Sequence, residues 1–290
     1  LYGDRHAYGM PFTGSGPEDE VRATEHRHVD WFHCTWLGPE QSTLLCVGNP
    51  DRDRLAGRLE ELLGDWRAHS GAAKTLGDAA TESEARILLL DRPDSVQSII
   101  FGGQVVPPRG HDDELSLEVF NHALGGAFTS RLNLNLREDK GWTYGAPSLL
   151  WSARGQRPFL LYASVQTDQT AASIGEMDRE LREMLDTRPI TGDELALAQT
   201  SLAGSLPARW ETLADLTASL EELIAYGLPS SYWDDYSDRI FALDTAAITQ
   251  DARRWVEPDR FIWVVVGDLA AVHPQIERLG LGPVREINDR

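Results

Sequence analysis

The stretch WVEPDRFIWVVVGD at residues 255–268 indicates how the chain is organised, because its pattern occurs twice. An earlier version, WLGPEQSTLLCVGN, occupies residues 36–49, so each position lies 219 residues before its counterpart. In both versions a tryptophan and a proline precede an apolar run that ends at a glycine. A second matching pair, AYGMP at 7–11 and AYGLP at 225–229, lies at nearly the same offset. Two matched blocks at almost one offset indicate a duplicated unit of about 219 residues.

The offset divides the chain into a partial unit and a complete one. A unit of that length ending at Arg290 begins at residue 72, which leaves only residues 1–71 for the first copy. We therefore expect a truncated first unit at residues 1–71 and a complete second unit at residues 72–290. Small and polar residues between 65 and 84 predict the linker that joins the two copies.

Hydrophobic periodicity assigns strands and helices to both copies. In the second copy we expect strands at residues 85–90, 96–106, 142–151, 159–166 and 261–266, with helices at residues 112–124, 128–137, 170–185, 211–225, 229–241 and 244–256, a long helix from Thr191, and a closing helix after Gly267. Thr191 and Glu194 have the spacing of a capping box. The last strand is apolar throughout and is therefore expected at the centre of the sheet.

The first copy offers a helix at residues 19–32, a strand at 43–47 and a helix at 51–63. In the complete copy, strands come first, helices follow and one strand returns. This order predicts the fold class α+β, with tandem homologous units that each form a largely antiparallel sheet with helices packed on one face. The first of these units is truncated.

Composition argues against two classes of protein. Lysine and arginine total 27 against 46 aspartate and glutamate residues, a net charge of −19 without a basic stripe, so nucleic acid is not an expected partner. The acidity favours solubility, and an acidic cavity that selects basic peptides is a second interpretation. No apolar stretch reaches the ~18 residues of a membrane span. Cys34 and Cys46 form no disulfide framework, and Cys46, inside an apolar run, is expected to be a buried thiol.

The histidines do not have the spacing of a zinc site. His26 and His28 are two residues apart, which places them on different faces of a helix. The motifs H-E-x-x-H and H-x-x-E-H do not occur in the chain. We therefore expect that this chain supplies neither a set of metal ligands nor a catalytic residue.

One segment stands apart as a candidate binding site: NHALGGAFTSRL at 121–132, followed by LREDKGWTYG at 136–145. The pair Gly125-Gly126 is expected to form a left-handed cap that ends one helix. Arg137 lies in the last turn of the next helix, and Tyr144 begins a strand just past the reversal at Gly141. A guanidinium and a phenol so placed can donate hydrogen bonds to one peptide carbonyl, or to the oxyanion formed from it.

A structural explanation of the same two residues has equal standing. Arg137 can cap its own helix or pair with a nearby acid, while Tyr144 fills one face of the sheet. Chemistry alone leaves these two interpretations open.

The segment from Asn121 to Gly145 resembles a pattern in the pitrilysin/insulinase family of zinc metallopeptidases, the inverzincins, which include the mitochondrial processing peptidase and the respiratory-chain core proteins. The pattern is N-x-x-L-G-G-x-F-x-S-R-L followed by L-R-E-x-x-G-x-x-Y-G, in the family's non-catalytic second domain. The stretch from His6 to Pro11 is similar to an H-P-Y-G-x-P segment of the zinc-bearing domain, with Ala7 in place of proline. The resemblance covers essentially the whole chain.

The resemblance implies a division of labour. Family members pair a domain bearing H-x-x-E-H with a homologous domain that lacks it, and the two close around a peptide. This chain would be the second domain plus the tail of the first, with Arg137 and Tyr144 as its substrate-binding pair. Glu118-x-x-Asn121-His122 is the nearest counterpart of the zinc motif, with Glu and Asn in place of His and Glu. Zinc would belong to the complete protease and not to this chain.

The expected partners are a zinc-bearing homologous domain or subunit and a peptide substrate, and a homodimer is a further option. Two other interpretations stay open: a natively inactive subunit of a two-chain protease, and a non-proteolytic scaffold or assembly protein of the same fold. Retention of Arg137 and Tyr144 argues mildly against the scaffold. A cytoplasmic and a periplasmic location are both compatible with the sequence.

Overall fold

The computed structural model describes residues 1–3, 6–9, 14, 16–67, 75–79 and 85–288. The chain forms two compact units. The sheet unit comprises Leu1–Gly3, Asp78–Leu206 and Tyr226–Arg290, and the helical unit comprises Asp4–Gly77 and Pro207–Ala225. This grouping differs from a simple division at residue 72, because residues 207–225 cluster with the N-terminal residues.

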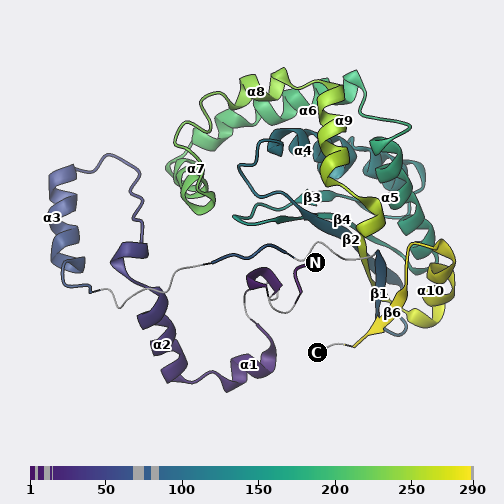
Figure 1. Ribbon diagram of the computed structural model, residues 1–290, viewed down its shortest axis with the longest axis horizontal. Helices are drawn as coiled ribbons and strands as arrows, with labels where there is room; N and C mark the ends of the chain where they lie inside the picture. The colour runs from purple at the N-terminus through teal and green to yellow at the C-terminus, as the bar shows by residue number, and fades with distance from the viewer. Residues whose placement is uncertain (4–5, 10–13, 15, 68–74, 80–84, 289–290) are drawn as a thin grey trace. The chain divides into compact units, whose positions relative to one another are not determined.

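The sheet unit contains a mixed six-stranded sheet in the order β3-β4-β2-β5-β1-β6 (Figure 1). Its strands are β1 (Arg86–Asp91), β2 (Gln97–Val106), β3 (Ser148–Leu150), β4 (Arg157–Gln166), β5 (Ile262–Gly267) and β6 (Val284–Ile287). Neighbours β3-β4, β4-β2 and β2-β5 pair antiparallel, whereas β1 pairs parallel with both β5 and β6. The apolar strand β5 is interior, as its composition predicts, and β6 is an edge strand that we did not expect.

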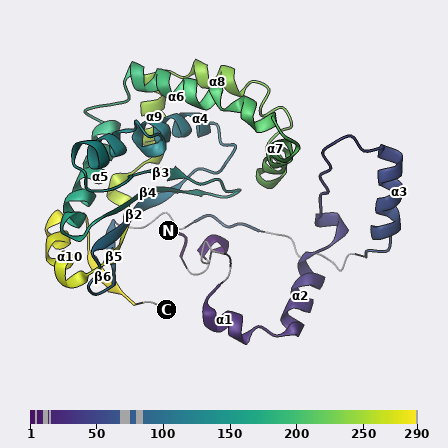
Figure 2. The ribbon, with the colours of Figure 1, turned by 180° about the vertical axis from the view of Figure 1, so that it is seen from behind.

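Helices cover one face of this sheet, which confirms the α+β class. They are α4 (Glu114–Asn121), α5 (Thr170–Leu185), α6 (Gly192–Gly204), α8 (Tyr236–Ala242) and α9 (Thr245–Trp255), seen on the same side of the strands in Figures 1 and 2. Alternate residues of β4 point into this layer: Leu161, Ala163 and Val165 are fully buried. Ile174 and Leu181 of α5 are fully buried as well. The helix layer therefore covers the apolar face that the alternation in β4 predicts.

Local sequence signals define several helix ends. The Thr191 hydroxyl accepts a hydrogen bond from the Glu194 amide, and the Glu194 carboxylate accepts one from the Thr191 amide, so the predicted capping box is present. Asp244 caps α9 through the Ala247 amide. After β5, Asp268 caps the closing helix α10 (Leu269–Ile276). Among the described residues, no helix is long and apolar enough to span a membrane.

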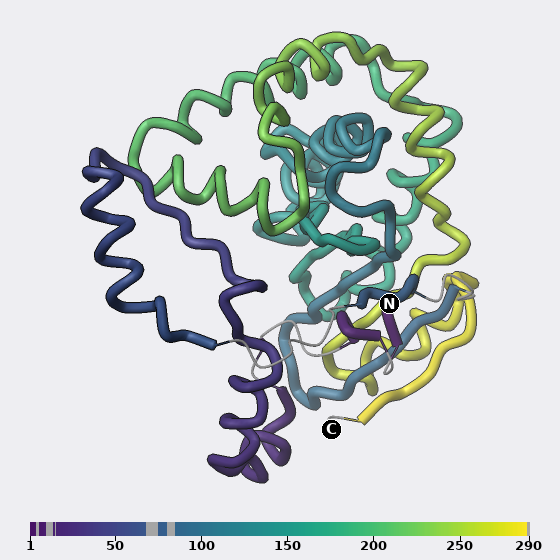
Figure 3. Tube along the Cα trace, turned by 60° about the vertical axis from the view of Figure 1, so that its left-hand side comes forward, coloured from purple at the N-terminus to yellow at the C-terminus, as the bar shows by residue number. Residues whose placement is uncertain are grey.

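The helical unit consists of α1 (Glu18–Ala23), α2 (His26–Trp36), α3 (Arg52–Leu63) and most of α7 (Leu213–Tyr226). The expected strand at 43–47 is wrong: these residues form no strand and run on from α2 toward α3 (Figure 3). The buried thiol is wrong too, because Cys46 is exposed. An apolar run becomes a buried strand only when a neighbouring strand supplies hydrogen bonds and covers it, and no strand pairs with residues 43–47 in the described part of the chain.

Local structure repeats at the sequence offset. Helix α2 ends at Trp36, and α9 ends at Trp255, 219 residues later. A 3-10 turn follows each helix, at Pro39–Gln41 and at Pro258–Arg260. At this offset, residues 43–47 correspond to part of β5. These matches support the duplication.

Candidate functional site

The Gly125-Gly126 pair occupies a π-helical turn and not a left-handed cap. Helix α4 continues into the π-helix η3 (His122–Gly126), and neither glycine has a positive φ. The prediction of a left-handed cap is therefore wrong. Position 125 requires glycine for another physical reason. A Cβ on Gly125 would lie 2.3 Å from the backbone nitrogen of Ser148 at the start of β3. Residue 125 must be glycine because the helix packs directly against the strand backbone.

The second helix of the segment is also π-helical. It comprises η4 (Asn133–Asp139), and the chain reverses at Gly141, which has φ of +64° as its position predicts. Only three residues of the expected 142–151 strand form β3. Thr143 makes an isolated bridge to Val165, so Tyr144 lies in a connecting loop and not in a strand.

Asn133 forms hydrogen bonds to the loops on both sides of η4. Its amide nitrogen donates to the Ala127 carbonyl at 2.9 Å and to the Ser130 hydroxyl at 3.2 Å. Its amide oxygen accepts a hydrogen bond from the Ala146 backbone nitrogen at 2.8 Å. Asn133 is buried, so these bonds form in a region of low dielectric constant where they are strong. One side chain thus joins the loop before η4 to the loop that carries Tyr144.

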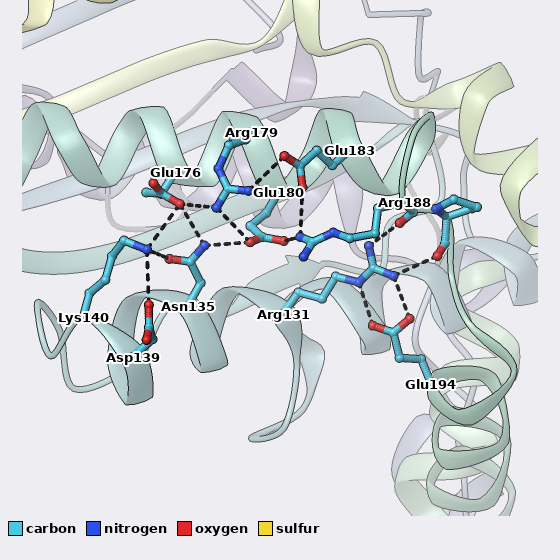
Figure 4. Close-up of polar contacts among 11 residues, drawn as sticks. Arg131, Asn135, Asp139, Lys140, Glu176, Arg179, Glu180, Glu183, Arg188 and Glu194 are labelled. Atoms are coloured by element: carbon cyan, nitrogen blue, oxygen red, sulfur yellow. Dashed lines mark hydrogen bonds and ion pairs between the residues drawn. The ribbon is translucent and has the colours of Figure 1, made fainter.

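A polar network attaches one face of η4 to helix α5 (Figure 4). Asn135 donates to Glu176 at 2.8 Å and to Glu180 at 2.6 Å, both on α5. Lys140 donates to the Asn135 amide oxygen at 2.7 Å and lies 3.5 Å from Glu176. Arg179 pairs with the α5 acids as well. Burial acts to raise the pKa of Glu176, but hydrogen bonds from Arg179 and Asn135 and the positive charges of Arg179 and Lys140 outweigh it and lower that pKa.

Arg131 extends this network to the start of α6 (Figure 4). Its guanidinium makes a two-pronged ion pair with Glu194, with N–O distances of 2.6 and 2.7 Å. It also donates to the carbonyls of Arg188 and Pro189. Burial acts to raise the pKa of Glu194, but the hydrogen bonds from Arg131 and Thr191 outweigh it and hold that pKa below its usual value. The polar groups on this face of the segment are therefore engaged within the protein.

Arg137 and Tyr144 differ from those residues because both are accessible. The Arg137 side chain is 33% exposed and lies over the ring of Phe128, 4.3 Å from its centroid. Its nearest acid, the exposed Glu138, lies 3.6 Å away, and its guanidinium has no hydrogen-bond acceptor in the part of the chain that the structure describes. Tyr144 is 93% exposed, which excludes the interpretation that it fills a face of the sheet. Substrate binding by the pair remains a proposal.

The counterpart of the zinc motif lies in a buried cluster of charges that the sequence does not reveal. Arg109 bridges Glu114 and Glu118 on α4, and Tyr232 and Tyr236 donate to these two carboxylates at 3.0 and 2.9 Å. Each tyrosine lies 118 residues from its carboxylate, so no local signal connects them.

This cluster does not suit a zinc ion. Glu118 is occupied by a guanidinium and a phenol, and the amide of Asn121 is not a usual zinc ligand. No group of three or more potential metal ligands occurs among the described residues. In this chain, α4 supplies carboxylates for internal ion pairs.

A cavity of about 410 Å³ opens elsewhere in the sheet unit, lined in part by Gln104, His111 and Trp255. Its wall groups already have partners. The Gln104 amide bonds the Trp255 carbonyl and the Glu257 backbone nitrogen, and the Trp255 indole donates to Asp113. Arg254 and Arg260 also line the cavity, and their guanidinium groups donate to Asp113 and Glu257.

Comparison with solved structures agrees with the fold. A crystal structure of a peptidase M16 inactive domain from Pseudomonas fluorescens matches with a TM-score of 0.79 at 22% identity, covering 87% of this chain and 60% of that one. A protease from Helicobacter pylori matches with a TM-score of 0.78 at 17% identity, covering 87% and 61%. At these identities the likeness concerns the fold alone.

Sequence comparison identifies curated relatives and a family. The chain is 28% identical over 208 residues to an uncharacterized zinc protease of Mycobacterium tuberculosis, and 25% identical over 205 residues to the uncharacterized zinc protease YmxG of Bacillus subtilis. Each match covers 71% of this chain and 46% or 48% of the relative, so the chain spans about half the length of these proteins. The model of the peptidase M16 inactive domain matches residues 27–202. Since this is more than half of the chain, the protein belongs to the peptidase M16 inactive-domain family.

Proposed function

We propose that this chain is the non-catalytic, substrate-binding C-terminal portion of a clamshell zinc metalloendopeptidase. It holds the backbone of a peptide for attack by a zinc-activated water that a homologous domain or a partner subunit supplies. One observation carries the proposal: Arg137 and Tyr144 offer accessible hydrogen-bond donors. Arg131 and Asn135 of the same segment are instead engaged in internal hydrogen bonds.

The chemistry of the two side chains suits this role. A guanidinium presents several N–H donors in one plane, and a phenol adds an O–H donor. Both can meet a peptide carbonyl and strengthen their bonds as negative charge develops on its oxygen. Holding the scissile carbonyl within reach of the attacking water removes much of the entropic barrier. The rigid attachment of η4 to α5 supports such a function, because a binding pair must be held in place.

The helical unit supports a homologous domain as the partner. It exposes large apolar side chains on α2 and along residues 43–47, including Trp31, Phe32 and Leu44. At the 219-residue offset, residues 43–47 correspond to part of β5, which lies between β1 and β2. A zinc-bearing domain of the same fold would supply the equivalent two neighbours and cover the apolar run. On this proposal, residues 1–71 are the tail of that domain and its linker.

The proposal is tested in an active protease assembled from this chain and a homologous domain that bears H-x-x-E-H. Arg137→Ala and Tyr144→Phe should each lower kcat/KM, with a loss of about 2–4 kcal/mol in transition-state binding, as for removing one oxyanion donor. Both residues are accessible, so the melting temperature should barely change.

Two variants at other positions serve as controls. Arg278→Ala and Tyr162→Phe remove the same chemical groups from the sheet unit and should leave turnover unchanged. Full turnover by both test variants would assign the pair a structural role and refute the proposed function.

A further inference from the structure

Phe128 places a large apolar ring on the surface beside the proposed binding pair. It is 62% exposed, although it lies only three residues after the buried Gly125. The backbone around it is fixed: the Ala127 carbonyl accepts hydrogen bonds from the Ser130 amide at 3.1 Å and from Asn133 at 2.9 Å. A loop fixed by hydrogen bonds therefore holds the ring at the surface.

The Arg137 guanidinium lies over the ring of Phe128. The central carbon of the guanidinium lies 4.3 Å from the ring centroid, well inside the ~6 Å range of cation–π attraction. In such a stack the aromatic face takes up the flat face of the guanidinium, and the N–H donors point outward in its plane. Arg131 illustrates the alternative, because Glu194 occupies its donors. Phe128 can therefore orient an arginine without using its hydrogen bonds.

We propose that Phe128 is a positioning residue, whose ring holds the Arg137 guanidinium edge-on to the backbone of a bound peptide. This inference rests on the proposed function and deepens it. Arginine has many rotamers, so ordering its side chain before binding reduces the conformational entropy that the side chain loses on binding. An aromatic ring is specifically required, because an aliphatic side chain of similar size has no π face.

A first experiment tests the stack in the intact chain and needs no ligand. The Nε–Hε signal of Arg137, assigned through Arg137→Lys, is followed by NMR in Phe128→Leu, Phe128→Tyr and Glu138→Gln. We expect Leu to abolish the ring-current shift of this signal, and Tyr to preserve it. Glu138→Gln should preserve it as well. The Glu138 carboxylate lies 3.6 Å from the Arg137 Nε, which is too far for a hydrogen bond that would hold the guanidinium. A signal unchanged by Phe128→Leu, or moved only by Glu138→Gln, would overturn the inference.

A second experiment tests the consequence for binding with a short fluorescein-labelled basic peptide. We expect Phe128→Leu to bind about threefold more weakly than the wild type, and Phe128→Tyr to bind as the wild type does. Equal binding by the Leu variant, with the stack lost by NMR, would refute a positioning role. If the wild type and Arg137→Lys bind equally, the proposed function fails. The NMR result then still decides whether Phe128 orients Arg137.

Discussion

At the residue scale, a few side chains with long-range partners decide the local structure around the candidate site. Gly125 allows η3 to approach β3, and Asn133 links Ala127 to Ala146. The sequence identifies the segment and its reversal at Gly141 through familiar glycine signals. It cannot show that Gly125 faces a strand backbone, because Ser148 lies 23 positions farther along the chain. For the same reason, sequence leaves the environment of Tyr144 open.

Gly125→Ala should destabilise the protein by about 1–3 kcal/mol, the usual cost of overpacking. The added Cβ would lie 2.3 Å from the Ser148 backbone nitrogen, so η3 or β3 must move. Gly192→Ala is the matched control, because nothing lies within 4 Å of its Cβ position and its φ is not positive. The urea midpoint measures both variants. A Gly125→Ala protein as stable as Gly192→Ala would show that the close approach is absent in solution.

At the scale of elements, prediction succeeds where local periodicity and caps determine the structure. Helix α5 begins at Thr170 and ends at Leu185 as expected, and the capping box starts α6. The π-helical form of η3 and η4 was not predicted, because a wider turn depends on tertiary packing. For residues 43–47 a strand was predicted that does not form. Their apolar pattern indicates a strand, but the described residues contain no neighbouring strand that pairs with them.

The link between Arg131 and α6 should make stability depend on pH. The pKa of Glu194 is lower in the folded protein than in the unfolded chain, so its ionised form stabilises the fold above the unfolded pKa. This contribution should disappear as the pH falls from the unfolded pKa of ~4.3 through the folded pKa.

Glu194→Gln should lower the free energy of unfolding at pH 7 by about 2 kcal/mol. When the pH is lowered, this variant should lose less stability than the wild type does. Asp193→Asn changes an exposed acid one position earlier and should keep the wild-type acid profile. Denaturant unfolding between neutral pH and pH 3 measures all three proteins. Parallel acid profiles for Glu194→Gln and the wild type would mean that this ion pair contributes little.

At the scale of the whole molecule, the duplication relates the two copies through corresponding elements. The sheet unit contains strand β5 with its neighbours β1 and β2 on either side. The corresponding residues 43–47 keep the apolar composition of a central strand, but none of them is buried: Leu44 is exposed, and Leu45 and Val47 are half-buried. Family membership and the length of the curated relatives favour a homologous domain as the missing neighbour.

Hydrogen exchange can locate the proposed partner on residues 43–47. In the chain alone, the backbone amides of these residues have no strand to bond and should exchange rapidly. Addition of a homologous H-x-x-E-H domain should slow their exchange by orders of magnitude, because pairing on both edges would bury the run as β5 is buried. Residues 263–266 of β5 are the internal control and should be protected in both samples. Protection of 43–47 in the chain alone, or continued rapid exchange in an assembled and active protease, would refute the correspondence between this run and β5.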